Sequence, residues 1–454
     1  MRSKKLWSLV LVMTGSLPVF AQPDSVQLAR LSSQIMQQST AYENLRYLCK
    51  QVGPRLSGSP QAQKAVEATA RMLKEAGADT VFLQPCMVPH WERGAKEIGV
   101  VSYGGKLKNL NVCALGMSIG TGPTGIKAGV IEVANFEELE KLSADVVKGK
   151  IVFFNYPMRP ELINGGYGDA VRYRSNGPVA AAKKGAIAVM IRSVTHALDN
   201  NPHTGTTRYD STVKKIPAFA CSTLDAEWLS KQLKQKTPVQ LFLKSNCKQG
   251  PDVLSYNVVG EIRGIEKPEE IITAGGHLDS WDLAEGAHDD GSGCVQSIEV
   301  IRAIKALGWK PKRTIRAVMF MNEENGLRGG NAYADYAKQH NEKHIFAVES
   351  DAGGFGIVSL GVSGNEAQFN KAKSWENLFK PYGVYEISKG GGGADIGPLR
   401  PFGTVLSGVN PGSQRYFDHH HAPNDVFEAV NKRELELGAF SMAAICWLVS
   451  EYGL

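Results

Sequence analysis

The sequence lacks several features that would place it in common classes of protein. Its seven cysteines are an odd number and form no Cys-x-x-Cys pair, so at least one stays unpaired in a monomer. Beyond the first twenty or so residues, no stretch approaches the ~20 consecutive apolar residues of a membrane-spanning helix. The glycines at 390–393 have no strand–GxxxxGK–helix context, so they do not indicate a phosphate-binding loop. Structural roles are expected for the cysteines, although Cys221 and Cys247 share one segment and are a candidate pair.

Strong net charge is also missing. The formal charge is +6, and the first 21 residues hold three bases and no acids. Without that segment, 48 basic residues face 45 acidic ones, leaving a charge of +3. A value so close to zero gives no indication of a nucleic-acid or membrane-surface partner.

The first residues have the composition of an export signal. Arg2, Lys4 and Lys5 precede an apolar run at 6–20, and a small-residue cleavage pattern ends at Ala21. No cysteine follows the cleavage point, so a lipoprotein anchor is not expected. We therefore predict a signal peptide over residues 1–21 and a mature protein that is secreted or periplasmic.

The composition and the predicted secondary structure of the chain change near residue 120 and again near residue 250. Helical spacing of apolar residues covers about 25–52 and 61–75, and two strands within 98–115 are joined by a Gly-Gly hairpin. Near residue 120 the chain becomes rich in glycine and proline, and short strands and helices follow to about 250. We interpret 121–245 as an inserted domain that interrupts one larger domain made of 22–120 and 246–454.

After the insert, strands and helices alternate to the C-terminus. This order favours an α/β fold with a mainly parallel sheet covered by helices on both faces. In open sheets of this kind, the chemistry lies beyond the carboxyl ends of the strands.

One stretch, IITAGGHLDSWDLAEGAHDDGSG at 271–293, carries the strongest signal. An apolar strand runs into a loop whose ionisable residues include His277, Asp279, His288, Asp289 and Asp290. Aspartate is rarely buried unless it is paired or binds a metal, so the cluster suggests a cation. Taken alone, it is also compatible with a polar, solvated loop.

Three further strand ends lead to residues of the same types. The four sets are His277 with Asp279, Glu323 with Glu324, Asp351, and the histidine run that ends at His421. Carboxyl ends of parallel strands meet at one edge of a sheet, so we expect these side chains to converge.

Two imidazoles and three carboxylates exceed the three protein ligands of one catalytic zinc. They fit two metal ions ~3.5–4 Å apart with one carboxylate bridging. Since Glu323 is next to Glu324, one of them can bind metal while the other acts as a general base. The predicted metal ligands are His277, Asp289, Glu324, Asp351 and His421.

The motifs GGHLDSW, AHDDGSG, NEENGLRGG, ESDAGG and HHHAPND resemble those of the zinc exopeptidases of peptidase family M28, which include secreted aminopeptidases and glutamate carboxypeptidases. The resemblance covers nearly the whole mature chain. VPHWERG, NPHTG, GGGGADIGPL and RYFDHHH are most similar to the plasma glutamate carboxypeptidase branch and its bacterial relatives. The resemblance implies a zinc-exopeptidase fold with an inserted protease-associated domain, two Zn²⁺ per chain and a short peptide substrate. It also suggests a homodimer.

The resemblance also implies a role for each residue. His277 with Asp351 and His421 with Glu324 would bind the two zinc ions, Asp289 would bridge them, Glu323 would be the general base, and Asp279 would support His277. Which zinc Asp351 and Glu324 each serve is left open. His420 is the alternative to His421, which is preferred because Asp425 follows it by four residues as in the family's motif.

Three residues are candidates for substrate contacts. Asp395, after the glycine run, would bind an ammonium terminus, and Arg208 would pair with an α-carboxylate. His203 belongs to the same loop as Arg208, in the insert that the resemblance places over the active site. For loop residues of this kind, simple solvation is the competing interpretation. If both termini are held, a dipeptide is the expected substrate.

Three other functions are weighed against this one. A general aminopeptidase of longer peptides would leave the carboxylate side open. A non-catalytic binding protein of the same architecture would have lost its ligands, and an acyltransferase similar to glutaminyl cyclases would use one zinc. The complete set of ligands and the base favour the peptidase.

Overall fold

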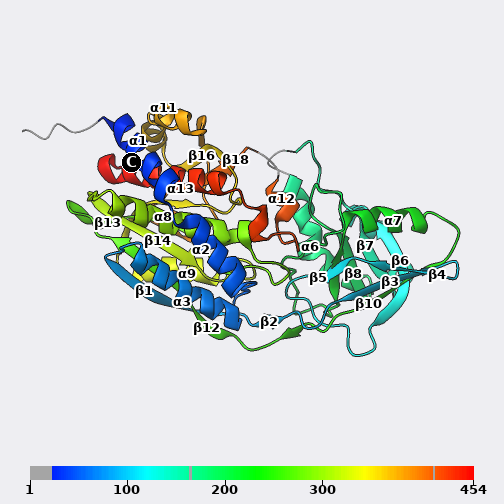
Figure 1. Ribbon diagram of the computed structural model, residues 1–454. Helices are drawn as coiled ribbons and strands as arrows, with labels where there is room; N and C mark the ends of the chain where they lie inside the picture. The colour runs from blue at the N-terminus through cyan, green and yellow to red at the C-terminus, as the bar shows by residue number, and fades with distance from the viewer. Residues whose placement is uncertain (1–22, 163–165, 413–414) are drawn as a thin grey trace, which may run out of the picture.

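A computed structural model of the chain describes residues 23–162, 166–412 and 415–454. The predicted signal peptide lies outside these residues. The molecule has two lobes side by side, each built on one eight-stranded sheet with its own helices (Figure 1). The first lobe is the larger, and it contains both ends of the described chain.

The sheet of the first lobe is mixed, and its centre is parallel. Strands β14, β13, β15 and β18 are parallel neighbours, flanked by antiparallel pairings of β12 on one side and β16 on the other. The strand order is β1 (Thr80–Val88), β12 (Val253–Ile262), β14 (Arg313–Phe320), β13 (Lys267–His277), β15 (Lys343–Glu349), β18 (Val405–Pro411), β16 (Ile357–Ser363) and β17 (Glu386–Lys389). The predicted α/β architecture is therefore confirmed.

Helices cover both faces of this sheet, as the sequence predicts. The apolar residues of α1 (Asp24–Gln38), α2 (Ala41–Tyr47), α3 (Pro60–Glu75), α8 (Ser292–Ala306) and α13 (Lys432–Tyr452) share one core with one face. The other face packs against α9 (Arg328–Gln339) and the short helix η4 (Gly397–Phe402). Two short helices, α10 (Glu366–Lys373) and α11 (Glu376–Phe379), lie near β16 and β17. No helix in the described ranges is long and apolar enough to cross a membrane.

Local chemistry fixes where these helices start. The hydroxyl of Ser59 accepts the backbone N–H of Ala62 at 3.1 Å, and Pro60 occupies the first turn of α3. A serine cap followed by proline satisfies or removes the donors that a helix start leaves free. Helix α3 therefore begins at Pro60.

The second lobe begins earlier than the predicted insert. Its strand order is β4 (Lys106–Leu110), β3 (Ile98–Tyr103), β10 (Val239–Lys244), β6 (Ile126–Val133), β7 (Ile151–Phe154), β8 (Ala188–Arg192), β9 (Ala218–Cys221) and β5 (Val112–Ala114). The sheet therefore starts at Ile98 rather than near residue 121. The reason is pairing: β3 runs antiparallel to β10 along its whole length, and β5 pairs with β9. The expected Gly104–Gly105 hairpin joins β3 to β4.

Four helices pack in the second lobe: α4 (Phe136–Lys141), α5 (Ala144–Val147), α6 (Gly166–Lys183) and α7 (Thr223–Leu233). Helix α6 lies on the side that faces the first lobe (Figure 1). This placement brings side chains of α6 within reach of the strand ends of the larger sheet.

The two connections between the lobes pair with each other. Strand β2 (Trp91–Glu92) leads into the second lobe and β11 (Lys248–Gln249) leads out, and the two are antiparallel. The chain thus leaves and re-enters the first lobe through adjacent segments, which is the geometry of an insertion.

All seven cysteines are free and buried. The candidate pair of Cys221 and Cys247 is therefore not formed. Burial raises the pKa of the Cys247 thiol to about 11, so it is held neutral like a small apolar side chain.

Candidate metal centre

The four parallel strands of the first lobe carry the predicted site at their carboxyl ends. His277 is the last residue of β13, Glu323 and Glu324 lie in the turn after β14, and Asp351 follows β15. His421 follows β18 and the one-turn helix α12 (Tyr416–His419). The remaining predicted ligand, Asp289, lies in the turn η2 (Ala287–Gly291) before α8, and its peptide bond to Asp290 is cis.

The ligand atoms converge around Asp289. Its Oδ1 lies 3.2 Å from Nε2 of His277, and its Oδ2 lies 3.2 Å from Nε2 of His421. Asp351 Oδ1 is 3.5 Å from the same nitrogen of His277, and Glu324 Oε2 is 3.0 Å from that of His421. Each imidazole thus has its own carboxylate and shares Asp289 with the other, which is the arrangement of a bridged two-metal site.

Buried atoms of this cluster have no hydrogen-bond partner. His277 Nε2, Asp289 Oδ2 and Glu324 Oε1 are inaccessible to solvent and make no hydrogen bond with any residue in 23–162, 166–412 or 415–454. Buried polar atoms are normally paired, so such atoms indicate a partner other than protein. Imidazole nitrogen and carboxylate oxygen are the ligands of catalytic zinc. The residues therefore fit zinc.

Charge in the cluster supports the same assignment. Burial raises the pKa of Glu324 to about 7, with His421 opposing this effect and Asp289 adding to it. Burial also works to raise the pKa of Asp289, but His277 and His421 outweigh it and hold the pKa well below its usual range. Several carboxylates packed in a buried space repel one another unless a cation neutralises them.

The choice between the two neighbouring histidines favours His421. The rings stack with centroids 3.5 Å apart, but His420 Nε2 is 3.9 Å from Asp289 Oδ2, farther than the 3.2 Å of His421. Only His421 lies within ion-pair distance of Glu324 among the described residues. His420 lines the cavity beside it.

Asp279 supports the site differently from the prediction. The Nδ1–H of His277 donates to the main-chain carbonyl of Asp279 at 2.9 Å, not to its carboxylate. The chain turns after His277, which brings the peptide under the ring. The carboxylate instead accepts the backbone N–H groups of Asn322 (2.6 Å) and Glu323 (3.1 Å). Asp279 therefore holds the turn that carries the predicted base.

Glu323 projects from that turn into the cavity. Burial, opposed by His277 and reinforced by Asp351 and Glu324, raises its pKa well above the usual range. A carboxylate next to the ligands but not among them is suited to accept a proton from water.

Asp425, four residues after His421, acts on the bridging loop. Its carboxylate accepts the backbone N–H groups of His288 (2.7 Å) and Asp289 (3.2 Å). Asp425 thus ties the loop that carries Asp289 to the segment that carries His421, although sequence reasoning used it only to choose His421.

Arg55 is a support that sequence reasoning missed. It is fully buried, and its three nitrogens donate to the carbonyls of Leu278 (2.5 Å), Glu285 (2.6 Å) and Gly286 (2.9 Å). These carbonyls belong to the loop between His277 and Asp289. Arg55 lies in the segment GPRLSGSP, whose glycines and prolines predict only a turn and do not indicate a role for the arginine.

Arg55→Met is expected to lower the free energy of unfolding by about 2 kcal/mol or more. The substitution removes the donors to the carbonyls of Leu278 and Glu285, whereas the carbonyl of Gly286 keeps the N–H of Gly291 (3.0 Å). Each unsatisfied group costs about 1–3 kcal/mol. The midpoint of urea unfolding, followed by circular dichroism at a fixed zinc concentration, measures the loss. Arg46→Met is the control, because Arg46 is half exposed, forms its ion pair with Glu43 on its own helix, and otherwise lies over the aromatic rings of Tyr42 and Phe427. Equal midpoints for the two variants would contradict this role of Arg55.

The insert completes the surroundings of His421 and Glu324. The N–H of Thr204 donates to the carbonyl of His421 (3.0 Å), and the Nδ1–H of His421 donates to the carbonyl of Thr204 (3.3 Å). The hydroxyl of Thr206 donates to the carbonyl of Glu324 at 2.7 Å. The loop at 203–206, which we call the clamp loop, therefore bonds to two predicted ligands from across the lobe junction.

His203 belongs to this clamp loop and not to the cavity wall. It is buried, and its Nδ1–H donates to the carbonyl of His420 at 2.7 Å. Burial lowers its pKa to about 4, so it is neutral. The predicted substrate contact of His203 is thus replaced by a contact with the ligand loop.

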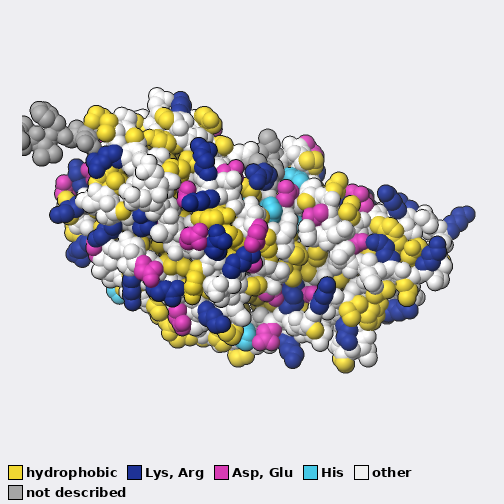
Figure 2. All heavy atoms as spheres, in the orientation of Figure 1, with side chains coloured by type: hydrophobic (Ala, Val, Ile, Leu, Met, Phe, Trp, Pro, Cys, Tyr) yellow, Lys and Arg dark blue, Asp and Glu magenta, His cyan; other side chains and the backbone are white. Residues whose placement is uncertain are grey.

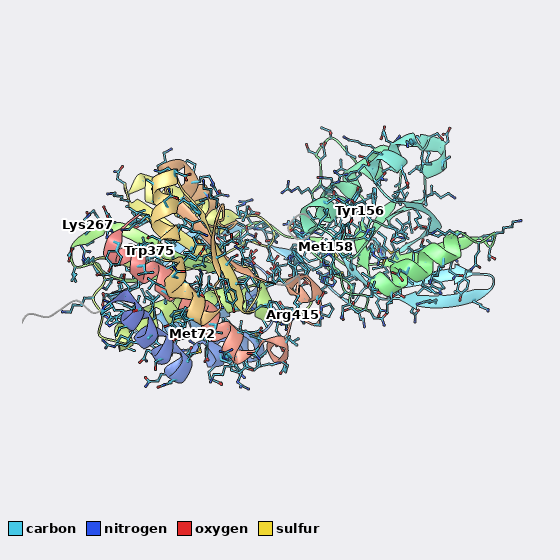
Figure 3. All side chains as sticks on the ribbon, turned by 90° about the horizontal axis from the view of Figure 1, so that it is seen from above. Met72, Tyr156, Met158, Lys267, Trp375 and Arg415 are labelled. Atoms are coloured by element: carbon cyan, nitrogen blue, oxygen red, sulfur yellow. The ribbon has the colours of Figure 1, made fainter. Side chains whose placement is uncertain are left out.

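A cavity of about 920 Å³ lies where the lobes meet. Asp289, Glu323, Glu324 and Asp351 line one side, and the insert lines the other with residues that include the predicted Arg208. Acidic and histidine side chains appear on the surface near this junction (Figure 2). From above, the labelled Met158 of the insert and Arg415 of the first lobe lie near the junction (Figure 3).

Asp395 is not part of the cavity wall. Its side chain is fully buried, and neither carboxylate oxygen makes a hydrogen bond within the described part of the chain. Burial, with Glu349 adding to it, raises the pKa of Asp395 well above its usual range. The glycines before it let the chain pass directly against Glu349, whose carboxylate accepts the N–H of Ile396 at 2.9 Å. Asp395 does not line this cavity, and its contact with an ammonium terminus stays a prediction.

Comparisons with known proteins agree with this geometry. Residues 257–445 match the family described as Peptidase family M28. The chain is 36% identical to bovine and to human carboxypeptidase Q, in each case over 91% of this chain and 86% of the relative. A crystal structure of an M28 peptidase precursor from Shewanella amazonensis has a TM-score of 0.90 at 33% identity, covering 94% of this chain and 96% of that one. A zinc aminopeptidase of Bacillus subtilis shares the fold, with a TM-score of 0.63 at 23% identity over 89% of this chain and 93% of that one.

Proposed function

Because the chain belongs to peptidase family M28, we propose that it is an exported exopeptidase that uses two zinc ions to hydrolyse short peptides, dipeptides above all. The observation that carries the proposal is the placement of the two Asp289 oxygens, 3.2 Å from His277 and 3.2 Å from His421. In the same proposal, the second lobe is a protease-associated domain that forms one wall of the active site.

The residues divide the chemical work between them. His277, Asp351, His421, Glu324 and the shared Asp289 would hold the metal ions. Zinc at such a centre acidifies water and polarises a peptide carbonyl. Glu323 takes the proton of the attacking water and passes it to the leaving amine, as a positioned base does. The hydroxyl of Tyr416 donates to Asp351 Oδ1 at 3.2 Å and keeps that carboxylate in place.

The charge of the cavity wall, more than the cavity volume, supports a short substrate. About 920 Å³ is near the upper end of the ~300–1,000 Å³ range of ligand pockets, so volume alone does not restrict the substrate to a dipeptide. The wall formed by the insert, however, carries Arg174, Arg208 and Lys215 and no acidic side chain among the described residues. A cationic wall opposite the metal ligands favours peptides whose free carboxylate lies close to the scissile bond.

The size of the cavity also favours a second candidate, a general aminopeptidase that accepts longer peptides. It has the same metal ligands and base but an open carboxylate side. The two candidates differ in the rates that they predict on blocked and extended substrates.

Zinc analysis and a substrate panel test the proposal. Purified protein loaded with zinc is expected to hold about two zinc ions per chain, since five ligands make one bridge and two pairs. A dipeptide is expected to be cleaved with a far higher kcat/KM than its N-acetyl form, its C-terminal amide or a pentapeptide. Equal rates on the amide and the pentapeptide would establish the general aminopeptidase instead. A zinc content of zero, or two zinc ions without turnover of any peptide, would rule out the proposed enzyme.

A further inference from the structure

We propose that Arg174 of helix α6 binds the α-carboxylate of the substrate, so that the inserted lobe selects peptides that end one residue beyond the scissile bond. This inference rests on the proposed peptidase function. It replaces Arg208, the residue that the sequence indicated, with an arginine in a different position on the same wall.

Five arginines are buried in the described part of the chain, and four of them have evident partners. Three form ion pairs with carboxylates within 3.0 Å: Arg93 with Asp282, Arg313 with Glu270, and Arg316 with Glu342. The fourth, Arg55, donates from each of its nitrogens to a main-chain carbonyl. In each of these four arginines, a carboxylate or a set of main-chain carbonyls compensates the cost of burying the charge.

Arg174 is the exception. Arg174 is 7% exposed, yet its contacts in the described residues are with a histidine, a hydroxyl and a carbonyl, and it forms no ion pair with a carboxylate there. Nη2 donates to the hydroxyl of Tyr167 (2.9 Å), and Nη1 lies 3.2 Å from Nδ1 of His421 and makes a long bond to the carbonyl of Thr204 (3.4 Å). Nε makes no hydrogen bond with the residues that the structure describes. A desolvated cation with spare donors calls for an anion that arrives from the cavity, which Arg174 lines.

The guanidinium is also held in place. It lies against Gly205, where an added Cβ would approach Nη1 to 2.3 Å, and the main-chain carbonyl of Arg174 accepts the hydroxyl of Thr207 at 2.9 Å. A fixed planar fork matches the two oxygens of a carboxylate and loses little entropy on binding it. Gly205 is needed because no larger residue leaves room for this side chain.

Its position fits the terminus of a short substrate. Nη1 of Arg174 lies 3.2 Å from Nδ1 of His421, whose other ring nitrogen faces Asp289 and Glu324. The α-carboxylate of a dipeptide is three bonds from the scissile carbonyl carbon. Its anchor therefore has to lie about one residue from the metal ligands, which is where Arg174 lies.

The other two cations of the wall are less suited to this role. Arg208 and Lys215 line the same cavity but are exposed, so water and salt screen their charges. We assign them to the mouth of the cavity, where they attract anionic substrates without fixing one end.

The test is the preference of the enzyme for a free acid over its amide. For the zinc-loaded wild type, kcat/KM on a dipeptide is expected to exceed that on its C-terminal amide by about 10²-fold or more. Arg174→Met is expected to lower kcat/KM on the free acid by a similar factor and to leave that on the amide nearly unchanged, with two zinc ions still bound. Arg174→Lys is expected to recover part of the preference. Arg172→Met is the matched control, because Arg172 lies on the same helix, is largely exposed and contacts Tyr173 and Glu137 instead of the cavity.

Each other outcome overturns the inference in a distinct way. An equal fall on acid and amide together with loss of zinc would show that Arg174 only positions His421. An unchanged preference in Arg174→Met with zinc intact would assign the carboxylate to another group. A wild type that cleaves acid and amide equally would reject carboxylate selection while the peptidase function stands. A zinc-loaded wild type that cleaves neither would reject the proposed function and this inference with it.

Discussion

Glu323→Gln is expected to lower kcat by about 10²–10⁴-fold while the zinc content stays at the level of the wild type. The amide is nearly isosteric with the carboxylate but cannot accept a proton from water. Glu323 lies in the cavity and belongs to none of the atom groups able to hold a metal among the described residues. Steady-state kinetics on a dipeptide and elemental analysis of the same preparation measure both parts of the prediction.

The neighbouring residue supplies the control. Glu324→Gln removes the charge of the carboxylate 3.0 Å from His421, so it is expected to weaken zinc binding as well as turnover. If Glu324→Gln kept both zinc ions and Glu323→Gln lost one, the roles of base and ligand would be exchanged. If both variants kept their zinc and their full activity, neither Glu323 nor Glu324 would have a role in the mechanism.

His421→Asn is expected to leave about one zinc ion per chain and to reduce kcat/KM by at least about 10²-fold, the usual cost of losing one electrostatic contact to the transition state. Asparagine is chosen because His421 has φ +64°, a left-handed conformation that asparagine tolerates better than most residues. The shorter side chain cannot reach the position of Nε2 between Asp289 and Glu324.

His420→Asn is the matched variant, and it is expected to keep two zinc ions. Its ring stacks on His421 and lines the cavity, so a modest change in KM is expected without loss of metal. The reverse pattern, with zinc lost from His420→Asn alone, would transfer the ligand role to His420.

The first lobe and the convergence of its candidate metal ligands could be predicted because two regular patterns coincide in the sequence. Alternation of strands and helices places the carboxyl ends of the strands at one edge, and ligand-type residues follow four of those ends. His277, Glu324, Asp351 and His421 are brought together by this rule, and their separation along the chain does not matter. Asp289 does not follow a strand end, and it was predicted as a ligand because its loop is dense in ionisable residues.

The contributions of the second lobe could not be predicted in the same way. Arg174 lies on a helix among other polar residues, so its sequence neighbours do not show that it points into a cavity. Asp395 was misplaced for a related reason, since a run of glycines does not reveal which way the chain turns. The start of the insert was set too late because strand pairing between Ile98–Tyr103 and Val239–Lys244 joins residues far apart in the sequence.

The pairing of β2 with β11 has a consequence for modularity. Because the insert enters and leaves through adjacent segments, its removal would leave chain ends that a short turn can join. The clamp loop prevents this from being a neutral deletion, since Thr204 and Thr206 bond to the main chain of His421 and Glu324. A chimaera that receives its insert from a relative would therefore inherit a working active site only if the donor also brings a loop that makes these bonds. The insert is a separate segment of the chain, but the proposed active site depends on its contacts.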